Sequence, residues 1–261
     1  MSDRLPPPPV PLPPPPVPPR SGFARLVGRV HPQEAGLPPA RWGVTEAFAG
    51  TLVAFVAAGV IGAAILAAGS SCGSPAMVAG EAVGELGIGA VILVWLRFVS
   101  KAPFAALGRP SRPVGDVVTG VLGGLALIVI ASVVAAIVIQ LVTVVIGHQP
   151  HEPSQIPSCV RGTWLALLGP VVILAAPVGE EMAFRGFLYR GLRARFSVWP
   201  AALMSGALFG LIHILPLIVP ALFVVGIGLA LIYEWRQSLL ASIAAHATFN
   251  LIGFLAIFHG R

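Results

Sequence analysis

The chain has 261 residues, of which 56% are hydrophobic and 10% are charged, whereas about 25% of the residues in an ordinary soluble domain are charged. This composition excludes a disordered chain, and it excludes a water-soluble globule because too few polar side chains are present to cover its surface. The net charge of +6 does not indicate nucleic acid as a partner, because the basic residues are scattered among the loops. We therefore expect an all-α fold, a polytopic transmembrane helical bundle of about seven spans in a lipid bilayer.

The N-terminal segment is dominated by proline. Eleven of the 26 prolines fall between Pro6 and Pro19. Proline fixes φ and lacks an N–H group, so this stretch favours an extended, disordered polyproline II tail. We expect residues 1–45 to form a cytosolic tail and linker, and we expect no signal peptide because the start runs into proline rather than into an apolar segment. A docking site for a proline-binding module is the alternative interpretation.

Seven apolar segments follow the tail. They are expected at about 46–68, 86–99, 117–147, 162–189, 199–215, 217–233 and 238–258, and an extension of the second segment over 78–85 is left open. The third segment has 31 residues without a charge, more than the ~20 that cross a bilayer, so it is expected to tilt or to extend past the lipid. Counts of six or eight spans stay open, because the last two segments also fit one span with a re-entrant piece.

The basic residues predict the orientation. With seven spans, thirteen of the sixteen basic residues fall on one side, and only Arg161 and Arg261 fall on the other. The positive-inside rule then places the N-terminus in the cytosol and the C-terminus outside, in a multi-pass protein of the cell membrane. Cys72 and Cys159 both fall in outward-facing loops, where they either pair as a disulfide or remain separate thiols.

Few ionisable residues lie inside the apolar segments. Each costs about 2.5–3.5 kcal/mol at the centre of a span, so such residues are candidates for function. The set comprises Glu180, Glu181, Arg185, His213 and His246, with Asn250 and Gln140 as neutral polar partners. Five further acidic residues lie at the ends of segments and are interpreted as interfacial groups that water can reach; these are Glu46, Glu81, Glu85, Asp116 and Glu234.

The spacing of these residues suggests how they are used. Glu181 and Arg185 are four residues apart and can pair on one helical face, which leaves Glu180 free to act as a general base. His246 and Asn250 are also four apart, as are Phe209 and His213. The alternative for each is structural: the ion pair holds helices together, and each histidine satisfies a backbone carbonyl.

Depth along the helices gives a second argument. At about 1.5 Å per residue, the polar groups of three spans lie roughly 12–21 Å from the cytosolic ends of their helices. They therefore share one layer, and we predict that they converge on a buried, water-accessible site.

Three strings in this part of the chain resemble the CPBP family, which comprises CAAX prenyl endopeptidases and bacteriocin-processing enzymes and is also called Abi. The strings are EEMAFRGFLYRGL (180–192), SGALFGLIH (205–213) and SIAAHATFN (242–250). They match the family pattern EExxxR, FxxxH and HxxxN in order. The resemblance covers about 162–256, whereas the first three spans and the tail resemble nothing specific. It divides the membrane part into N-terminal helices (46–160) and a CPBP-like catalytic core (161–258).

The resemblance implies an intramembrane glutamate protease and a role for each matched residue. Glu180 and His213 would activate a water molecule, while His246 and Asn250 would donate hydrogen bonds in the oxyanion hole. Glu181 and Arg185, together with Phe209, would support the architecture. The implied substrate is a peptide bond of a membrane-associated protein or peptide, with or without a prenyl group, and the implied cofactor requirement is none.

Rival interpretations remain. Two carboxylates and two imidazoles could bind zinc, but no HExxH motif is present and Asn250 would be an uncommon zinc ligand, so the metal-free mechanism is favoured. A non-catalytic membrane protein, such as a bacteriocin immunity factor or a scaffold, is the alternative function. A transporter or proton relay would be expected to show inverted repeats, which the sequence lacks.

Overall fold

The computed structural model describes residues 40–68, 72–110, 112–150 and 156–259, so the predicted polyproline tail lies outside the described residues. Within these ranges all regular structure is helical. The elements in chain order are α2 (Val44–Ala68), α3 (Pro75–Phe98), η2 (Phe104–Leu107), α4 (Pro113–Ile146), α5 (Gly162–Pro170), η3 (Val171–Ala175), α6 (Ala176–Glu181), η4 (Met182–Tyr189), α7 (Arg190–Arg193), α8 (Val198–Leu211), α9 (Val219–Arg236) and α10 (Leu239–His259).

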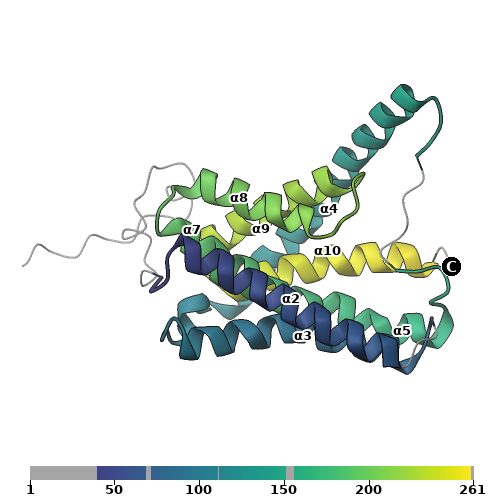
Figure 1. The fold of residues 1–261 in the computed structure, drawn as a ribbon. Helices are drawn as coiled ribbons and strands as arrows, with labels where there is room; N and C mark the ends of the chain where they lie inside the picture. The colour runs from purple at the N-terminus through teal and green to yellow at the C-terminus, as the bar shows by residue number, and fades with distance from the viewer. Residues whose placement is uncertain (1–39, 69–71, 111, 151–155, 260–261) are drawn as a thin grey trace, which may run out of the picture.

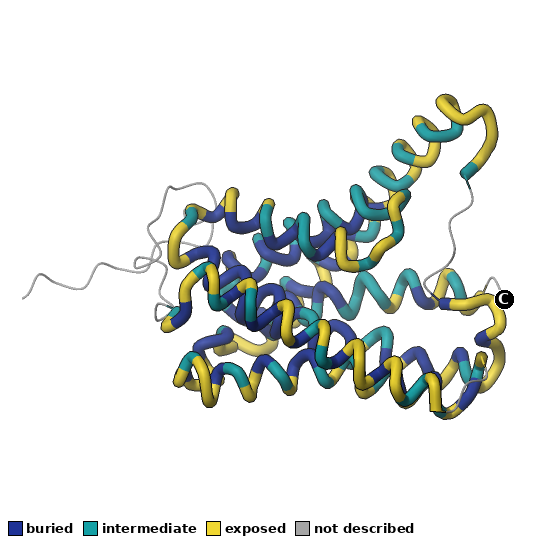
Figure 2. The backbone as a smooth tube through the Cα atoms, viewed as in Figure 1, coloured by how far each residue is buried: buried dark blue, intermediate teal, exposed yellow. Residues whose placement is uncertain are grey.

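The predicted polytopic bundle is confirmed. Among the described residues, six helical stretches are long and apolar enough to cross a membrane, and one of them runs without a break from α5 to α7. The fifth predicted span corresponds to α8, which has only 14 residues. This is about 21 Å of helix and less than the ~30 Å hydrocarbon core. Figure 2 shows exposed residues along the outer faces of the helices, and many of the exposed residues are large hydrophobics. This is the surface expected against lipid.

The helices pack in pairs through small residues. The pairs are α2 with α3, α4 with α10, and α8 with α9 (Figure 1). A Cβ on Gly120 of α4 would lie 2.5 Å from the Ala241 carbonyl oxygen of α10, so the α4–α10 contact depends on backbones that approach closely. This contact matters for the site because α10 carries His246.

The third span departs from the bundle. α4 has 34 residues, about 51 Å of helix, and its buried residues end at Ala131. The remainder projects away from the other helices (Figure 1). The great length of this span therefore takes the form of a segment that lies outside the bundle.

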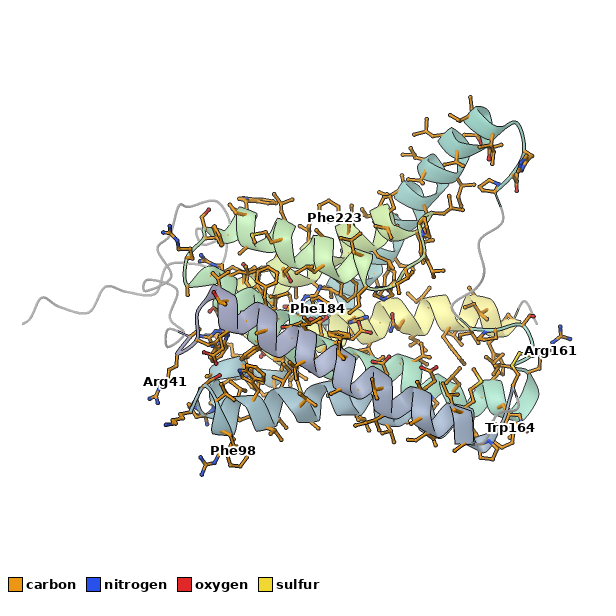
Figure 3. The ribbon with its side chains drawn as sticks, in the orientation of Figure 1. Arg41, Phe98, Arg161, Trp164, Phe184 and Phe223 are labelled. Carbon is orange, nitrogen blue, oxygen red and sulfur yellow. A yellow bond between two sulfur atoms is a disulfide. The ribbon has the colours of Figure 1, made fainter. Side chains whose placement is uncertain are left out.

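The bundle has two chemically different ends. Arg41 lies at one end and Arg161 at the other (Figure 3). We call the first the basic end; it holds the start of α2, the end of α3, α7 and the end of α9. At the opposite end Cys72 and Cys159 form a disulfide with their Cα atoms 6.0 Å apart, which answers the question that the sequence left open, and we call it the disulfide end.

Two acidic residues interpreted as water-exposed are instead buried at the basic end. Asp116 is fully buried and pairs with Arg236 Nη2 at 2.6 Å. Glu234 is 3% exposed and accepts hydrogen bonds from Arg193 and Tyr189. Their partners lie on other helices or come from other parts of the chain, so sequence position alone did not reveal the burial.

The last residues of the segment assigned to the linker already belong to the core. The Trp42 ring stacks on Phe187, with centroids 4.9 Å apart, and its indole N–H donates to the Phe187 carbonyl oxygen at 2.9 Å. The described chain is thus anchored to η4 just before α2 begins.

Candidate active site

The two adjacent glutamates lie between two π-helical stretches. α6 ends at Glu181, η3 precedes α6 and η4 follows it. Pro170 and Pro177 interrupt the ordinary helical hydrogen bonding, because proline has no N–H group to donate. Local π geometry is frequent at functional sites because it changes the direction in which side chains project. The sequence spacing predicts a regular α-helix here and gives no sign of the π-helical geometry.

Glu181 is the centre of a buried network. Its Oε1 accepts a hydrogen bond from Arg185 Nη1 at 2.6 Å and another from His246 Nδ1 at 3.0 Å. Arg185 also donates from Nη2 to the Gly226 carbonyl oxygen at 3.0 Å. The predicted ion pair is therefore present, and it joins α6 and η4 to both α9 and α10.

Glu180 is not part of that pair. Its Oε2 lies 4.0 Å from His246 Nε2, and no described residue donates a hydrogen bond to this buried oxygen. The side chain is 12% exposed and lines a cavity. A single water molecule can bridge a gap of this size, so Glu180 and His246 lie within water-bridged reach.

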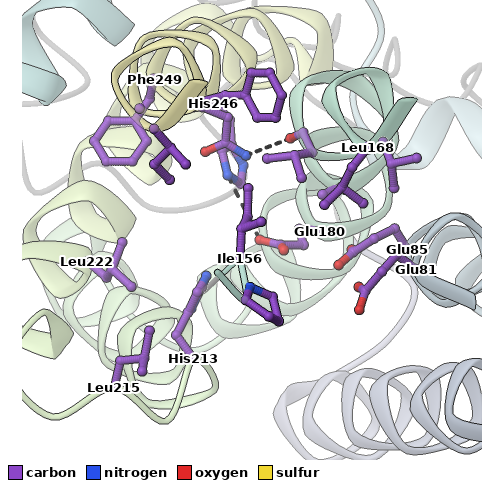
Figure 4. A pocket seen from close by; sticks show the side chains of 18 of the residues that line it. Glu81, Glu85, Ile156, Leu168, Glu180, His213, Leu215, Leu222, His246 and Phe249 are labelled. Atoms are coloured by element: carbon purple, nitrogen blue, oxygen red, sulfur yellow. Dashed lines mark hydrogen bonds and ion pairs between the residues drawn. The ribbon is translucent and has the colours of Figure 1, made fainter. Parts of the chain in front are cut away.

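His213 enters the site just beyond the end of α8. Its Nδ1 lies 2.7 Å from the Phe209 carbonyl oxygen, and a carbonyl can only accept, so Nδ1 carries the hydrogen. The Nε2 of the neutral ring therefore holds a lone pair. His213 lines the same cavity as Glu180 and His246 and points toward it (Figure 4).

Phe209 packs between the polar groups. Its ring centroid lies 5.0 Å from that of His213 and 5.5 Å from that of His246. The Arg185 guanidinium carbon lies 4.6 Å from the same centroid. The phenyl ring thus packs against both imidazoles on one side and the guanidinium on another.

Asn250 faces the π-helical stretch before the glutamates. Its Nδ2 donates to the Val172 carbonyl oxygen in η3 at 2.9 Å. A carboxamide nitrogen has two N–H groups, so a second donor remains. Asn250 lines the cavity together with His246 and Glu180.

The hydrogen bonds also constrain the protonation of His246. Because Glu181 already accepts from Arg185, the bond between His246 and Glu181 makes Nδ1 the donor. Nε2 can then donate to a substrate only when the ring is an imidazolium. The positive charge of such an imidazolium is balanced here. The two cations, Arg185 and His246, would face two carboxylates, Glu180 and Glu181.

The cavity has a volume of about 550 Å³ and contains two acidic residues that the sequence argument placed at the interface. Glu81 and Glu85 line it from α3 (Figure 4). The extension of the second span over 78–85, which the sequence left open, is present, because α3 begins at Pro75. Ser74 caps α3 by accepting from the Met77 N–H, and Pro75 occupies the first turn, so a helix-start signal was present in the sequence.

A second cavity of about 370 Å³ borders the first. Its walls are α2 and α3, and it shares Glu81, Glu85, Glu180 and His213 with the larger cavity. The candidate catalytic pair therefore lies where two cavities join.

Gly179 holds α3 close to Glu180, and its replacement by valine is expected to destabilise the protein by about 1–3 kcal/mol. A Cβ there would overlap the Glu85 carbonyl oxygen, which belongs to the backbone and cannot swing aside. The measurement is thermal unfolding of the purified protein in detergent. The control is Gly253→Val, because a Cβ at Gly253 would meet no heavy atom within 4 Å. Equal losses in both variants would contradict the tight α3–α6 contact.

The arrangement of donors bears on the zinc alternative. Among the residues of the described ranges, no group of three or more His, Cys, Asp or Glu side chains is arranged to hold a metal ion. Glu181 is already engaged by Arg185 and His246, so its Oε1 is not free to bind a metal ion.

Comparison with known proteins matches the part of the chain that carries the site. Residues 161–252 match the family described as type II CAAX prenyl endopeptidase Rce1-like. No curated protein and no solved structure matches the chain. The matched range contains all seven residues singled out in the three sequence motifs.

Proposed function

Because residues 161–252 belong to the Rce1-like family of type II CAAX prenyl endopeptidases, we propose that this chain is a glutamate-dependent intramembrane endopeptidase. At the level of family, the match supports a CAAX-type intramembrane protease embedded by several apolar helices. The observation that carries the proposal is the Glu180 carboxylate, whose buried Oε2 accepts no hydrogen bond from any described residue and faces His246 Nε2 across 4.0 Å in a cavity. The substrate is a membrane-associated protein or peptide, with or without a prenyl group.

The first step is attack of water on the scissile carbonyl carbon. Glu180 accepts a proton from the water, and the lone pair on His213 Nε2 orients the same molecule. The new C–O bond forms as the carbonyl oxygen becomes an oxyanion. Collapse of this intermediate breaks the C–N bond, and the proton held by Glu180 passes to the leaving amine.

The oxyanion is stabilised by donors from α10. His246 donates from Nε2 as an imidazolium, and Asn250 donates from the N–H group that Val172 leaves free. Donors fixed before the reaction stabilise developing charge without reorganising. They act strongly here because a membrane-embedded cavity has a low effective dielectric constant.

Glu181, Arg185 and Phe209 position these groups without touching the substrate. Glu181 fixes the tautomer and direction of the His246 ring, and Arg185 balances the charge of Glu181. Phe209 packs on both imidazoles. The three residues therefore act through His246 and His213.

The cytosolic location of the basic end remains a proposal that two independent features support. The Lys and Arg residues of the loops gather at that end, as the positive-inside rule requires of a cytosolic face. The disulfide lies at the opposite end, and disulfides persist in oxidising compartments outside the cytosol.

Chelators are expected to leave the cleavage rate unchanged. The proposed steps use only carboxylate, imidazole and carboxamide groups of the chain, so removal of divalent metal removes nothing from them. The measurement is the rate of cleavage by the purified protein before and after dialysis against EDTA and 1,10-phenanthroline. Loss of activity that zinc restores would instead favour the metalloprotease mechanism.

The direct test of the proposed function is comparison of membrane proteomes from cells that carry the wild-type chain and cells that carry Glu180→Gln. Substrates are expected to accumulate uncut in the second strain while the variant protein reaches wild-type levels. A non-catalytic role predicts the reverse, namely a fall in the amount of the variant protein with no uncut substrate.

A further inference from the structure

The wall that α3 gives to the candidate site contains two glutamates that the proposed steps do not use. Glu81 and Glu85 line both cavities at the point where these meet Glu180. Both lie outside residues 161–252, so the family match assigns them no role. In Figure 4 their side chains extend toward the space beside Glu180. The site therefore holds more carboxyl groups than the general base alone requires.

Glu85 is held beside Glu180 by a backbone contact. Gly179, the residue before Glu180, packs so closely on α3 that a Cβ there would overlap the Glu85 carbonyl oxygen. The carboxyl groups of Glu85 and Glu180 are near enough for their negative charges to repel each other. Because the two helices meet through backbone atoms here, the place from which the Glu85 side chain starts is fixed relative to Glu180.

The surroundings of Glu85 provide no positive charge. Its Oε2 is buried and accepts no hydrogen bond from any described residue. Among the described residues no lysine or arginine lines either cavity, and α2 contributes only apolar residues to the second one. The titratable groups that border both cavities with Glu85 are Glu81, Glu180 and His213. Glu180 differs from Glu85, because His246 Nε2 faces its Oε2 at 4.0 Å.

This difference indicates which of the two carboxyl groups carries a proton. Carboxylates that share a buried space do not both remain ionised, so the pair is expected to hold one proton. The imidazolium form of His246 stabilises the ionised form of Glu180, whereas no described cation does the same for Glu85. The proton is therefore expected on Glu85, and Glu180 remains the carboxylate that accepts a proton from water.

The other polar groups of the cavity are committed to different tasks. His213 Nδ1 donates to the Phe209 carbonyl oxygen, so its Nε2 has a lone pair and no proton to give. His246 and Asn250 are the proposed donors to the oxyanion, and both belong to α10. In the view of Figure 4, Glu180 lies between His246 and the carboxyl groups of α3. A substrate whose carbonyl oxygen points toward α10 can thus place its leaving nitrogen on the α3 side.

We propose that Glu85 is the general acid that protonates the leaving amine. The inference rests on the proposed function and adds to it a second catalytic carboxyl group. Glu180 takes a proton from the attacking water as the C–O bond forms, and Glu85 then gives its own proton to the nitrogen as the C–N bond breaks. The proton on Glu180 passes to the Glu85 carboxylate afterwards and restores both groups. The net transfer of a proton from water to the amine is unchanged.

A change of leaving group tests this role. A peptide from a substrate found in the proteome comparison is compared with an ester of the same acyl segment and a phenol, because a phenolate leaves without being protonated. Glu85→Gln is expected to lower kcat for the peptide by about 10²-fold, the lower end of the usual range, since Glu180 can still give its proton directly. For the ester the expected loss is less than about tenfold.

Two control variants make the same chemical change elsewhere. Glu46→Gln lies outside both cavities and is expected to leave both rates at the wild-type value. Glu81→Gln lies four residues earlier on α3, and a leaving-group effect there but not in Glu85→Gln would overturn the assignment. Equal losses with peptide and ester in Glu85→Gln, or no loss with either, would also overturn it. Glu85→Met is expected to show the same contrast and replaces Glu85→Gln if that variant does not accumulate.

Infrared spectroscopy tests the proton on Glu85 without catalysis. At neutral pH the wild-type protein in detergent is expected to show the C=O band of a carboxylic acid that is absent from Glu85→Gln. The same band in both proteins, or in neither, would overturn the inference. Full cleavage by Glu180→Gln would instead refute the proposed function, whereas an inactive Glu180→Gln variant together with equal peptide and ester losses in Glu85→Gln would refute the inference alone. The two failures are therefore distinguishable.

Discussion

Replacing Glu180 with glutamine is expected to lower the rate of peptide cleavage by about 10²–10⁴-fold, the usual contribution of a general base. Glutamine keeps the size of the side chain but cannot accept the proton of the attacking water. Folding is expected to be unaffected, because the buried Oε2 takes no hydrogen bond from the described residues and the change removes a charge from the membrane. The measurement is the turnover rate of the purified variant on an identified substrate.

The matched control for this prediction is Glu46→Gln. It makes the same chemical change at the basic end, outside both cavities, where Glu46 Oε1 accepts hydrogen bonds from Trp95 and Ser100 that a glutamine oxygen can keep. Its cleavage rate is expected to match that of the wild type. Full activity of purified Glu180→Gln would rule out the proposed mechanism.

Replacing Arg185 with methionine is expected to destabilise the protein by about 3–5 kcal/mol, the cost of breaking a buried pair by removing one partner. Arg185 and Glu181 are both fully buried, so the variant leaves the Glu181 carboxylate without its guanidinium. Methionine fills part of the volume and does not restore the charge balance. The measurement is the unfolding temperature of purified protein in detergent.

A double variant separates the structural role of this pair from its role in catalysis. Glu181→Gln combined with Arg185→Met removes both charges, so stability is expected to recover most of the loss. Cleavage is expected to stay low, because His246 Nδ1 no longer donates to a carboxylate that stabilises the imidazolium. Recovery of stability and cleavage together would show that Glu181 has no part in positioning His246.

Several features of the site could be predicted from single helices. The i, i+4 spacing of Glu181 and Arg185 predicted an ion pair, and the two side chains form one at 2.6 Å. It forms even though the residues between them are π-helical. The helix rise converts sequence number into position along the helix, and from it Glu180, His213 and His246 were predicted to meet at one site. All three line the same cavity. Such relations depend on one helix at a time and are therefore readable in the sequence.

Other features needed the packing of several helices. The sequence suggested that Glu181 pairs with Arg185 alone, whereas it also accepts from His246, 65 residues away on α10. Glu81 and Glu85 were interpreted as interfacial because they lie near the end of a span, and they line the cavity beside Glu180 instead. Hydrogen-bond partners and cavity walls come from different spans, and no local pattern records which spans become neighbours.

By itself the sequence determined a helical membrane protein, the limits of most of its spans, a layer of ionisable residues in three of them and the segregation of basic residues to one side. These follow from hydropathy, from helix geometry and from the high cost of placing charge in lipid. Tertiary structure decided that Cys72 and Cys159 meet, that α8 stops short of the far side and that α3 adds acidic side chains to the wall of the cavity. Those outcomes depend on distances between helices, which are set by close contacts such as Gly179 against Glu85 and Gly120 against Ala241.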